Sequence, residues 1–195
     1  MYTIDKIYEY TQTIKKSIFI CTLIPVSSLE EVNTKLKEIR KKYYDATHNC
    51  YSYILLTDDN TELIKASDDG EPSQTAGVVI LDVLKKQSLT NILAVVTRYF
   101  GGIKLGAGGL VRAYSSSTSE AVKSASLKEI VKMTTIEVTI NYSYVNEILT
   151  LFKDYTILKQ DYNENVTISF LIPEKDKESL VQKIINITKN SAFIA

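Results

Sequence analysis

The sequence predicts an α+β protein of two domains, and two observations support this prediction. All seven glycines lie between Gly70 and Gly109, and none occurs later in the chain. Residues 133–195 alternate between short strand-like and helix-like stretches. We place the domain boundary near residue 132, which gives domains of residues 1–132 and 133–195. A chain of 195 residues can bury a sizeable core and is expected to hold one or two domains.

The first domain is predicted to open with a hairpin of Thr3–Tyr10 and Ile18–Pro25. Ser28 and Glu31 have the spacing of a capping box, so a helix should follow and end near Lys42. The remaining predicted elements are strands Tyr51–Leu56 and Glu62–Ala66 across an Asp58-Asp59-Asn60 turn, a helix over Thr75–Lys86, a strand over Ile92–Phe100, and a helix from about Leu110 to Ala125. The strand over Ile92–Phe100 is apolar on both faces, which is typical of a central, covered strand.

The second domain is predicted to have the order β-α-β-β-α-β. Its elements are a strand Thr135–Tyr142, a helix Tyr144–Lys153 capped by Ser143, strands Tyr155–Gln160 and Val166–Ile172 across an Asp161–Asn165 turn, a helix Glu174–Thr188 with Pro173 in its first turn, and a strand Ala192–Ile194. This order is the ferredoxin-like plan. Because so many functions use that plan, it says little about this one.

The composition is ordinary for a soluble globular protein and excludes several functional classes. The 23 basic and 23 acidic residues leave no net charge to steer the chain toward nucleic acid or an anionic membrane, so any phosphate recognition must be local. The first residues lack the regions of a signal peptide, and no apolar run is long enough to cross a bilayer. Cys21 and Cys50 show no CxxC spacing, which favours the reducing cytoplasm and a small, buried, apolar role for each.

The best candidate site is the glycine-rich segment 101–109, which holds five of the seven glycines. A strand precedes it and a helix start follows it, an arrangement in which free backbone N–H groups can face an anion. The ending of a Walker A loop and the GxGxxG fingerprint are both absent. The candidate phosphate-binding residues are Arg98, Lys104, Gly106, Gly108, Gly109 and Arg112. The alternative is that the glycines only allow positive φ angles and close strand–helix approach.

Five further residues are secondary candidates. Asp68, Asp69 and Glu71 could offer oxygens to a hard cation such as Mg²⁺, but their spacing is not that of an EF-hand. A salt bridge from this acidic loop to Arg98 or Arg112 is the favoured use. We predict neither a metal nor a cofactor.

The other two secondary candidates are His48 and Cys50. His48 is the only histidine, which excludes a multi-histidine metal site. On a strand, His48 and Cys50 would share one face and could form part of a thiol nucleophile site. The favoured alternative is a hydrogen-bonded histidine beside a core cysteine.

Two small basic patches, Lys15-Lys16 and Arg40–Tyr44, could contact RNA phosphate. The second patch, at a predicted helix end, is more simply explained as complementing the helix dipole.

Three segments resemble the IMPACT/YigZ family: Asp45–Tyr51, Asp68–Ser73 and Val96–Tyr114. The resemblance covers the whole chain, since residues 1–130 are similar to the IMPACT N-terminal domain and the remainder to the small domain that bacterial members append. Two positions depart from the pattern. Bacterial relatives often have Gly in place of Gln74 and Arg in place of Ile18, and the second difference removes a cation from the hairpin.

The resemblance implies a first domain like the α/β sandwich of elongation factor G domain IV, in a superfamily shared with a ribosomal-protein domain and GHMP kinases. The second domain resembles domain V of the same factor. This pairing implies a cytoplasmic, non-enzymatic regulatory protein linked to translation that contacts structured RNA, the ribosome or another phosphate-bearing ligand. The alternatives are an enzyme acting on a nucleotide or phosphorylated metabolite, and a module that binds a protein partner. The partner competition of eukaryotic members does not transfer, because bacterial members lack the domain that performs it, and the resemblance implies no catalytic residues.

Overall fold

The computed structural model describes residues 1–57 and 61–195, which form two compact units, Met1–Ile130 and Val131–Ala195. Each unit combines helices with antiparallel strands, which confirms the predicted α+β class. The turn predicted at Asp58-Asp59-Asn60 falls outside the described residues. None of the helices in the described part of the chain has the length and hydropathy needed to span a bilayer.

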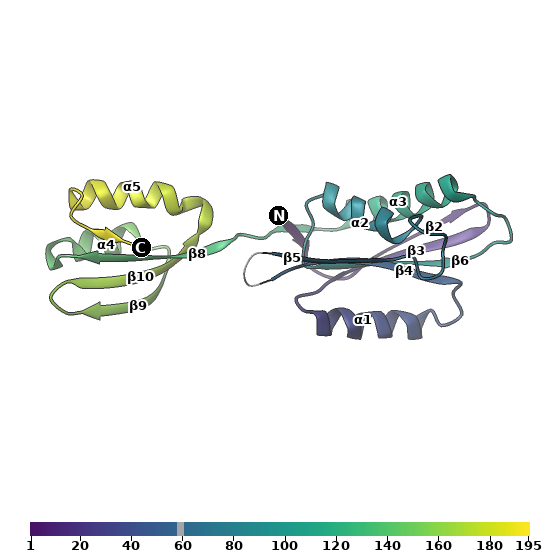
Figure 1. The fold of residues 1–195 in the computed structure, drawn as a ribbon, viewed down its shortest axis with the longest axis horizontal. Helices are drawn as coiled ribbons and strands as arrows, with labels where there is room; N and C mark the ends of the chain where they lie inside the picture. Colours follow the sequence, from purple (N-terminus) through teal and green to yellow (C-terminus); the bar gives the residue numbers. More distant parts are fainter. Residues whose placement is uncertain (58–60) are drawn as a thin grey trace. The chain divides into compact units, whose positions relative to one another are not determined.

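The first unit contains an antiparallel sheet with the strand order β2-β3-β6-β4-β5 (Figure 1). Its elements are β1 (Tyr2–Ile4), β2 (Tyr8–Ile14), β3 (Ser17–Pro25), α1 (Leu29–Lys42), β4 (His48–Leu56), β5 (Glu62–Ser67), α2 (Gly77–Lys86), β6 (Ile92–Tyr99), α3 (Ala107–Ser124) and β7 (Leu127–Glu129). Strands β1 and β7 pair with each other outside this sheet. The helix α1 begins as predicted, because the Ser28 hydroxyl accepts a hydrogen bond from the Glu31 N–H at 3.2 Å.

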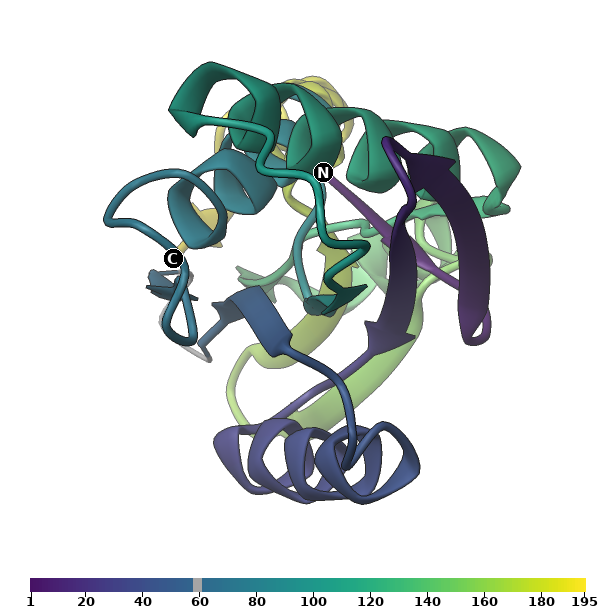
Figure 2. The same cartoon turned by 90° about the vertical axis from the view of Figure 1, so that its right-hand side faces the viewer.

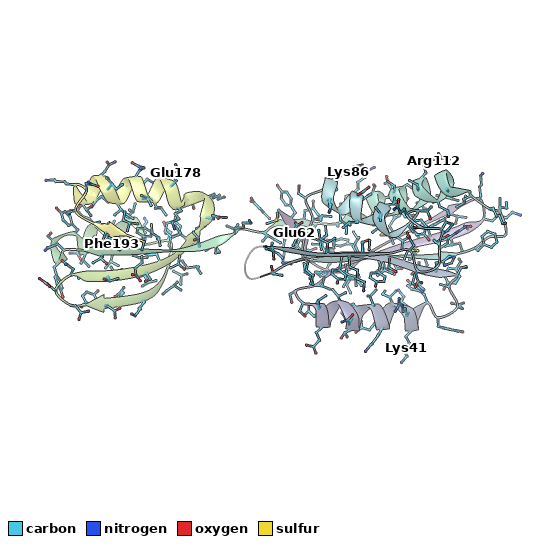
Figure 3. All side chains as sticks on the ribbon, in the orientation of Figure 1. Lys41, Glu62, Lys86, Arg112, Glu178 and Phe193 are labelled. Carbon is cyan, nitrogen blue, oxygen red and sulfur yellow. The ribbon has the colours of Figure 1, made fainter. Side chains whose placement is uncertain are left out.

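The sheet is covered on both faces: α1 packs on one face, and α2 and α3 pack on the other (Figures 1 and 2). Strand β6 lies at the centre and is buried from Ile92 to Arg98, as the sequence predicted. Ile92, Ala94 and Val96 join the core under α2 and α3, and the alternate residues Leu93 and Val95 join the core under α1. Because the helices lie on opposite faces, Lys41 on α1 and Arg112 on α3 point away from opposite sides of the sheet (Figure 3).

The predicted bounds of the first strand were wrong. The hairpin partner of β3 is β2, Tyr8–Ile14, and the two strands are joined by the two-residue turn Lys15-Lys16. Both lysines have positive φ angles, 46° and 65°, as a type I′ turn requires. Glycine and asparagine are the usual residues in such turns, so two lysines did not indicate one.

The second unit is an antiparallel sheet in the order β11-β8-β10-β9, the order that a ferredoxin-like β-α-β-β-α-β chain forms (Figure 1). Its elements are β8 (Met133–Ile140), the 3₁₀ turn η1 (Tyr142–Tyr144), α4 (Val145–Leu151), β9 (Thr156–Tyr162), β10 (Val166–Pro173), the 3₁₀ turn η2 (Glu174–Asp176), α5 (Lys177–Thr188) and β11 (Phe193–Ile194). Two local predictions need correction. Asn141, not Ser143, caps the first helical segment, and Pro173 ends β10 opposite Met133 instead of entering the helix.

Candidate functional site

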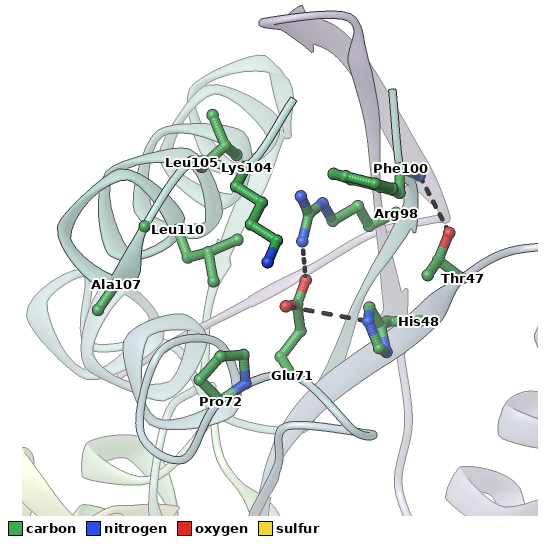
Figure 4. Close-up of a pocket in the computed structure, with 11 residues that line it drawn as sticks. Thr47, His48, Glu71, Pro72, Arg98, Phe100, Lys104, Leu105, Ala107 and Leu110 are labelled. Carbon is green, nitrogen blue, oxygen red and sulfur yellow. Dashed lines mark hydrogen bonds and ion pairs between the residues drawn. The ribbon is translucent and has the colours of Figure 1, made fainter. Parts of the chain in front are cut away.

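A pocket of about 420 Å³ opens in the first unit where β6 ends and α3 begins (Figure 4). It combines polar or charged side chains with an apolar wall and the backbone of the glycine-rich segment. Its lining residues are Thr47, His48, Glu71, Arg98 and Lys104 on the polar side, and Pro72, Phe100, Leu105, Gly106, Ala107 and Leu110 on the apolar and backbone side. The glycine-rich segment therefore borders a cavity.

Sheet register brings the polar floor of this pocket together. Phe19 on β3 and His48 on β4 lie directly opposite Arg98 on β6, on either side of it. Because side chains alternate along a strand, all three point to the face that α2 and α3 cover. His48 and Arg98 line the pocket, and Phe19 belongs to the buried core beside them, so strand pairing places two distant segments on one pocket floor.

Glu71 lies at the centre of a polar cluster in the pocket. Its Oε1 atom accepts hydrogen bonds from Arg98 Nη1 at 2.6 Å and from the Tyr114 hydroxyl at 2.8 Å. Its Oε2 atom lies 3.9 Å from His48 Nε2. The predicted salt bridge between the acidic loop and Arg98 is confirmed. Arg112 takes no part in it, and the charge of Arg98 is balanced by Glu71.

The positive character of the pocket comes from its rim. Helix α3 begins at Ala107, and its first backbone bond runs from the Leu110 N–H to the Gly106 carbonyl. The N–H groups of Ala107, Gly108 and Gly109 precede that bond, and no described side chain caps them. Lys104 extends over the pocket in Figure 4, and no described residue lies within ion-pair distance of its ammonium. Together the helix N-terminus and Lys104 make the rim suitable for an anion.

Two glycines are required by the fold itself. A Cβ atom on Gly101 would lie 2.1 Å from the carbonyl carbon of Lys16, so the segment can approach the hairpin turn only without a side chain. Gly106 has a φ angle of +70° at the N-cap of α3, a conformation that favours glycine. Fold requirements therefore account for part of the glycine-rich pattern.

The other predicted cation faces a neighbouring cavity. Arg112 and Gly109 line a second pocket of about 560 Å³ together with Lys15 of the hairpin turn, and Leu105 lies between the two pockets and lines both. The structure thus brings Arg98, Lys104 and Gly106 together and sets Gly109 and Arg112 beside them. Gly108 lies under the Arg112 side chain, whose Nη1 atom would be 3.7 Å from a Cβ at that position.

The carboxylates of Asp68 and Asp69 accept hydrogen bonds from backbone N–H groups. Asp68 Oδ1 accepts from the N–H groups of Ala76 and Gly77 at 3.0 and 2.8 Å, where α2 begins. Asp69 Oδ2 accepts from the Asn49 N–H at 2.7 Å. Among the residues that the structure describes, no group of three or more His, Cys, Asp or Glu side chains is placed to hold a metal ion.

The same loop contains Gln74, whose N–H donates to Asp68 Oδ2 at 2.9 Å. Gln74 has a φ angle of +63°, in the left-handed region that glycine adopts without strain. This conformation explains why a glycine is acceptable in the position that Gln74 occupies.

His48 and Cys50 form hydrogen bonds that favour a structural role. The Cys50 Sγ atom lies 2.9 Å from the Asp68 carbonyl and 3.3 Å from the Tyr114 hydroxyl, and burial raises the pKa of this thiol to about 12. The thiol is therefore protonated at neutral pH, which argues against a thiolate nucleophile. His48 Nδ1 lies 2.8 Å from the Asp69 carbonyl.

Sequence reasoning missed six pocket residues, and Thr47 and Phe100 are the two that a specific hydrogen bond joins. The Thr47 hydroxyl accepts a hydrogen bond from the Phe100 N–H at 3.0 Å and so joins the start of β4 to the end of β6. A polar residue next to His48 and an aromatic residue next to the glycines were the available indications, and neither pattern is specific.

Comparison with known protein families identifies the family of this chain. The model of the Impact N-terminal domain matches residues 15–122, which include every residue that lines the two pockets except Ile14. The chain belongs to the IMPACT family. A domain of unknown function, DUF1949, matches residues 138–191 of this IMPACT-family chain.

Individual relatives agree with this assignment. The IMPACT family member YvyE of Bacillus subtilis is 38% identical over 195 residues, covering 99% of this chain and 89% of the relative. The family member YigZ of Escherichia coli is 30% identical over 182 residues, covering 92% and 89%. A crystal structure of a hypothetical protein matches with a TM-score of 0.66 and 28% identity, covering 99% of this IMPACT-family chain and 95% of that chain. The two-unit fold therefore recurs in a solved structure.

Proposed function

We propose that this IMPACT-family chain is a translation-linked binding protein that contacts the phosphates of structured RNA through the glycine-rich end of its first unit. The observation that carries the proposal is the convergence of Lys104, Arg112 and Lys15 on two adjoining pockets beside the N-terminus of α3. Among the described residues, none of the three cations has an ion-pair partner. Their charge is thus available to an anionic ligand.

The charge balance favours a small contact. The chain has no net charge, so attraction to RNA must arise from this local cluster. Glu71 is the carboxylate in the first pocket, and its charge is balanced by Arg98, which leaves the rim cations uncompensated. The proposed link to translation rests on the resemblance of the two units to domains IV and V of elongation factor G.

Filter binding of transfer RNA and of ribosomes at two salt concentrations tests the proposal. The variant Lys104→Ala/Arg112→Ala should bind more weakly, and the slope of log affinity against log salt should fall by about one for each phosphate contact removed. The control Lys37→Ala/Lys41→Ala removes two exposed lysines from α1, on the opposite side of the sheet, and should bind as the wild type does. Equal affinities for all three proteins would reject the phosphate contact.

One observation favours an enzyme acting on a nucleotide or phosphorylated metabolite as the second candidate. The first pocket is within the usual size range of small-molecule sites and has His48 and Glu71 on its floor. A ligand that binds the folded state raises the melting temperature. A thermal-shift screen with nucleotides and Mg²⁺ should therefore give a rise for an enzyme of this class, and no rise would reject this candidate.

A further inference from the structure

Phe100 is an aromatic ring held in place at the mouth of the first pocket. The residue is 46% exposed, although its backbone N–H is fixed by the Thr47 hydroxyl at 3.0 Å. The Arg98 guanidinium carbon lies 5.4 Å from the ring centroid, within the range of a cation–π contact. Figure 4 shows the two side chains extending alongside each other at the pocket. The ring is therefore oriented by its neighbours while much of it stays open.

The Arg98 guanidinium contacts both this ring and an aromatic ring of the core. Its guanidinium carbon also lies 5.4 Å from the centroid of Phe19, which is fully buried. The ion pair with Glu71 fixes the guanidinium between the core and Phe100. Because the supporting residues are buried, Phe100 can receive a planar group without a change in the core.

A second observation at the same place points to a ligand. The Arg98 side chain is only 6% exposed and lines the pocket, yet its buried Nε atom has no hydrogen-bond partner among the described residues. A buried donor without an acceptor is unfavourable, and buried polar groups are nearly always paired. The described residues thus leave the Arg98 side chain, beside the pocket, with one donor unpaired.

We infer that the first pocket takes one unpaired nucleotide, with its base stacked on Phe100 and its phosphate directed to Lys104 and the N-terminus of α3. This inference rests on the proposed RNA contact and specifies which part of the RNA is bound. Bases stack on aromatic side chains when they are not held in a helix. The cavity of about 420 Å³ is within the size range of small-ligand pockets. The recognised element is thus an unpaired base in a loop or bulge, not a continuous double helix.

A fluorescence experiment tests the base contact by itself. The chain contains no tryptophan, so Phe100→Trp introduces a single reporter at the pocket mouth. Adenosine monophosphate should quench its fluorescence, whereas ribose 5-phosphate should not, because the sugar phosphate lacks the base. The control Tyr2→Trp places a tryptophan at a site of similar exposure, 41%, in β1 of the same unit, and its fluorescence should not change. Quenching of both variants, or of neither, would overturn the inference.

Binding to short RNA completes the test. Wild-type protein should bind oligoadenylate more tightly than an abasic chain of the same length, and Phe100→Leu should lose roughly 5- to 150-fold in affinity for oligoadenylate, the range measured for one stacked base. Phe100→Tyr keeps the ring and should retain binding. If the wild type binds transfer RNA but Phe100→Leu binds oligoadenylate as tightly as the wild type does, the stacked base is rejected while the proposed function stands. If the wild type binds no RNA, the proposed function fails, and quenching of Phe100→Trp by adenosine monophosphate would still support the nucleotide pocket.

Discussion

Arg98 and Glu71 form an ion pair with 2.6 Å between Nη1 and Oε1, and their side chains are only 6% and 3% exposed. The pair joins the end of the central strand β6 to the acidic loop that precedes α2. The Tyr114 hydroxyl donates to the same carboxylate oxygen, so α3 is attached at this point as well. One carboxylate thus connects three of the segments that surround the first pocket.

Removing one partner of this pair should destabilise the protein strongly. Glu71→Ala leaves the Arg98 charge buried without a partner, and we expect a loss of about 3–5 kcal/mol in the free energy of unfolding, measured in urea. The double variant Arg98→Met/Glu71→Leu removes both charges and should be more stable than Glu71→Ala. As a control, Lys35→Ala breaks the exposed pair with Glu38 and should cost less than about 1 kcal/mol. A double variant less stable than Glu71→Ala would contradict this interpretation.

The Asp68 carboxylate should contribute to stability through backbone hydrogen bonds. Asp68→Ala leaves the N–H groups of Gln74, Ala76 and Gly77 without their acceptor, and we expect a loss of about 0.5–2 kcal/mol in urea unfolding, as for a lost helix cap. Asp68→Asn keeps one acceptor oxygen and should lose less. Asp82→Ala removes an exposed acid of α2 and serves as the control, with a change within about 0.5 kcal/mol. Equal stability of the Asp68→Ala and control variants would show that these bonds contribute nothing.

Two adjacent glycines should respond differently to substitution. Gly101→Ala places a Cβ atom 2.1 Å from the Lys16 backbone, so the hairpin turn must move, at a cost of about 1–3 kcal/mol or more. Gly102 has open space around it and a φ angle of +80°, so Gly102→Ala should cost about 1–2 kcal/mol from backbone strain alone. Asparagine tolerates the left-handed region, so Gly102→Asn should recover stability that Gly101→Asn does not. Thermal unfolding of the four variants distinguishes the two causes.

The two cysteines should be unreactive in the folded protein at neutral pH. Burial raises the pKa of both the Cys21 and Cys50 thiols from 9.0 to about 12. A disulfide reagent at pH 8 should modify neither thiol until the chain is unfolded, whereas an exposed cysteine introduced by Ser73→Cys should react at once. Rapid modification of a thiol in the folded wild type would contradict the expected burial.

The same pKa shifts predict how stability depends on pH. Below pH 9 both states hold the thiol protons, and the contribution of the buried thiols is fully present. Between pH 9 and about 12 the unfolded chain loses these protons first, so stability should fall as the pH rises. The fall should be smaller in Cys21→Ala/Cys50→Ala, which lacks both groups. Urea unfolding at several pH values measures the difference, and parallel curves for the two proteins would reject the linkage.

Local sequence patterns were sufficient to predict an element where the type of residue alone determines its structure. The apolar run from Ile92 identified the central strand because burial on both faces requires it. The hairpin was placed wrongly because Lys15-Lys16 adopts a turn for which lysine is not typical. The acidic loop and Arg98 could be paired from charge alone, but the opposition of His48 and Arg98 depends on strand register, which no local pattern gives. The exposure of Phe100 likewise depends on the surrounding fold.

His48, the only histidine of the chain, lies on the floor of the first pocket. After exchange of the amide protons for deuterium, its imidazole Hε1 proton should therefore give a single resonance, downfield of the rings of the 13 tyrosines and 5 phenylalanines. A compound that enters the cavity alters that resonance directly. The molecule thus carries its own spectroscopic reporter at the place where a ligand is sought, and a compound library can be screened against the unmodified protein.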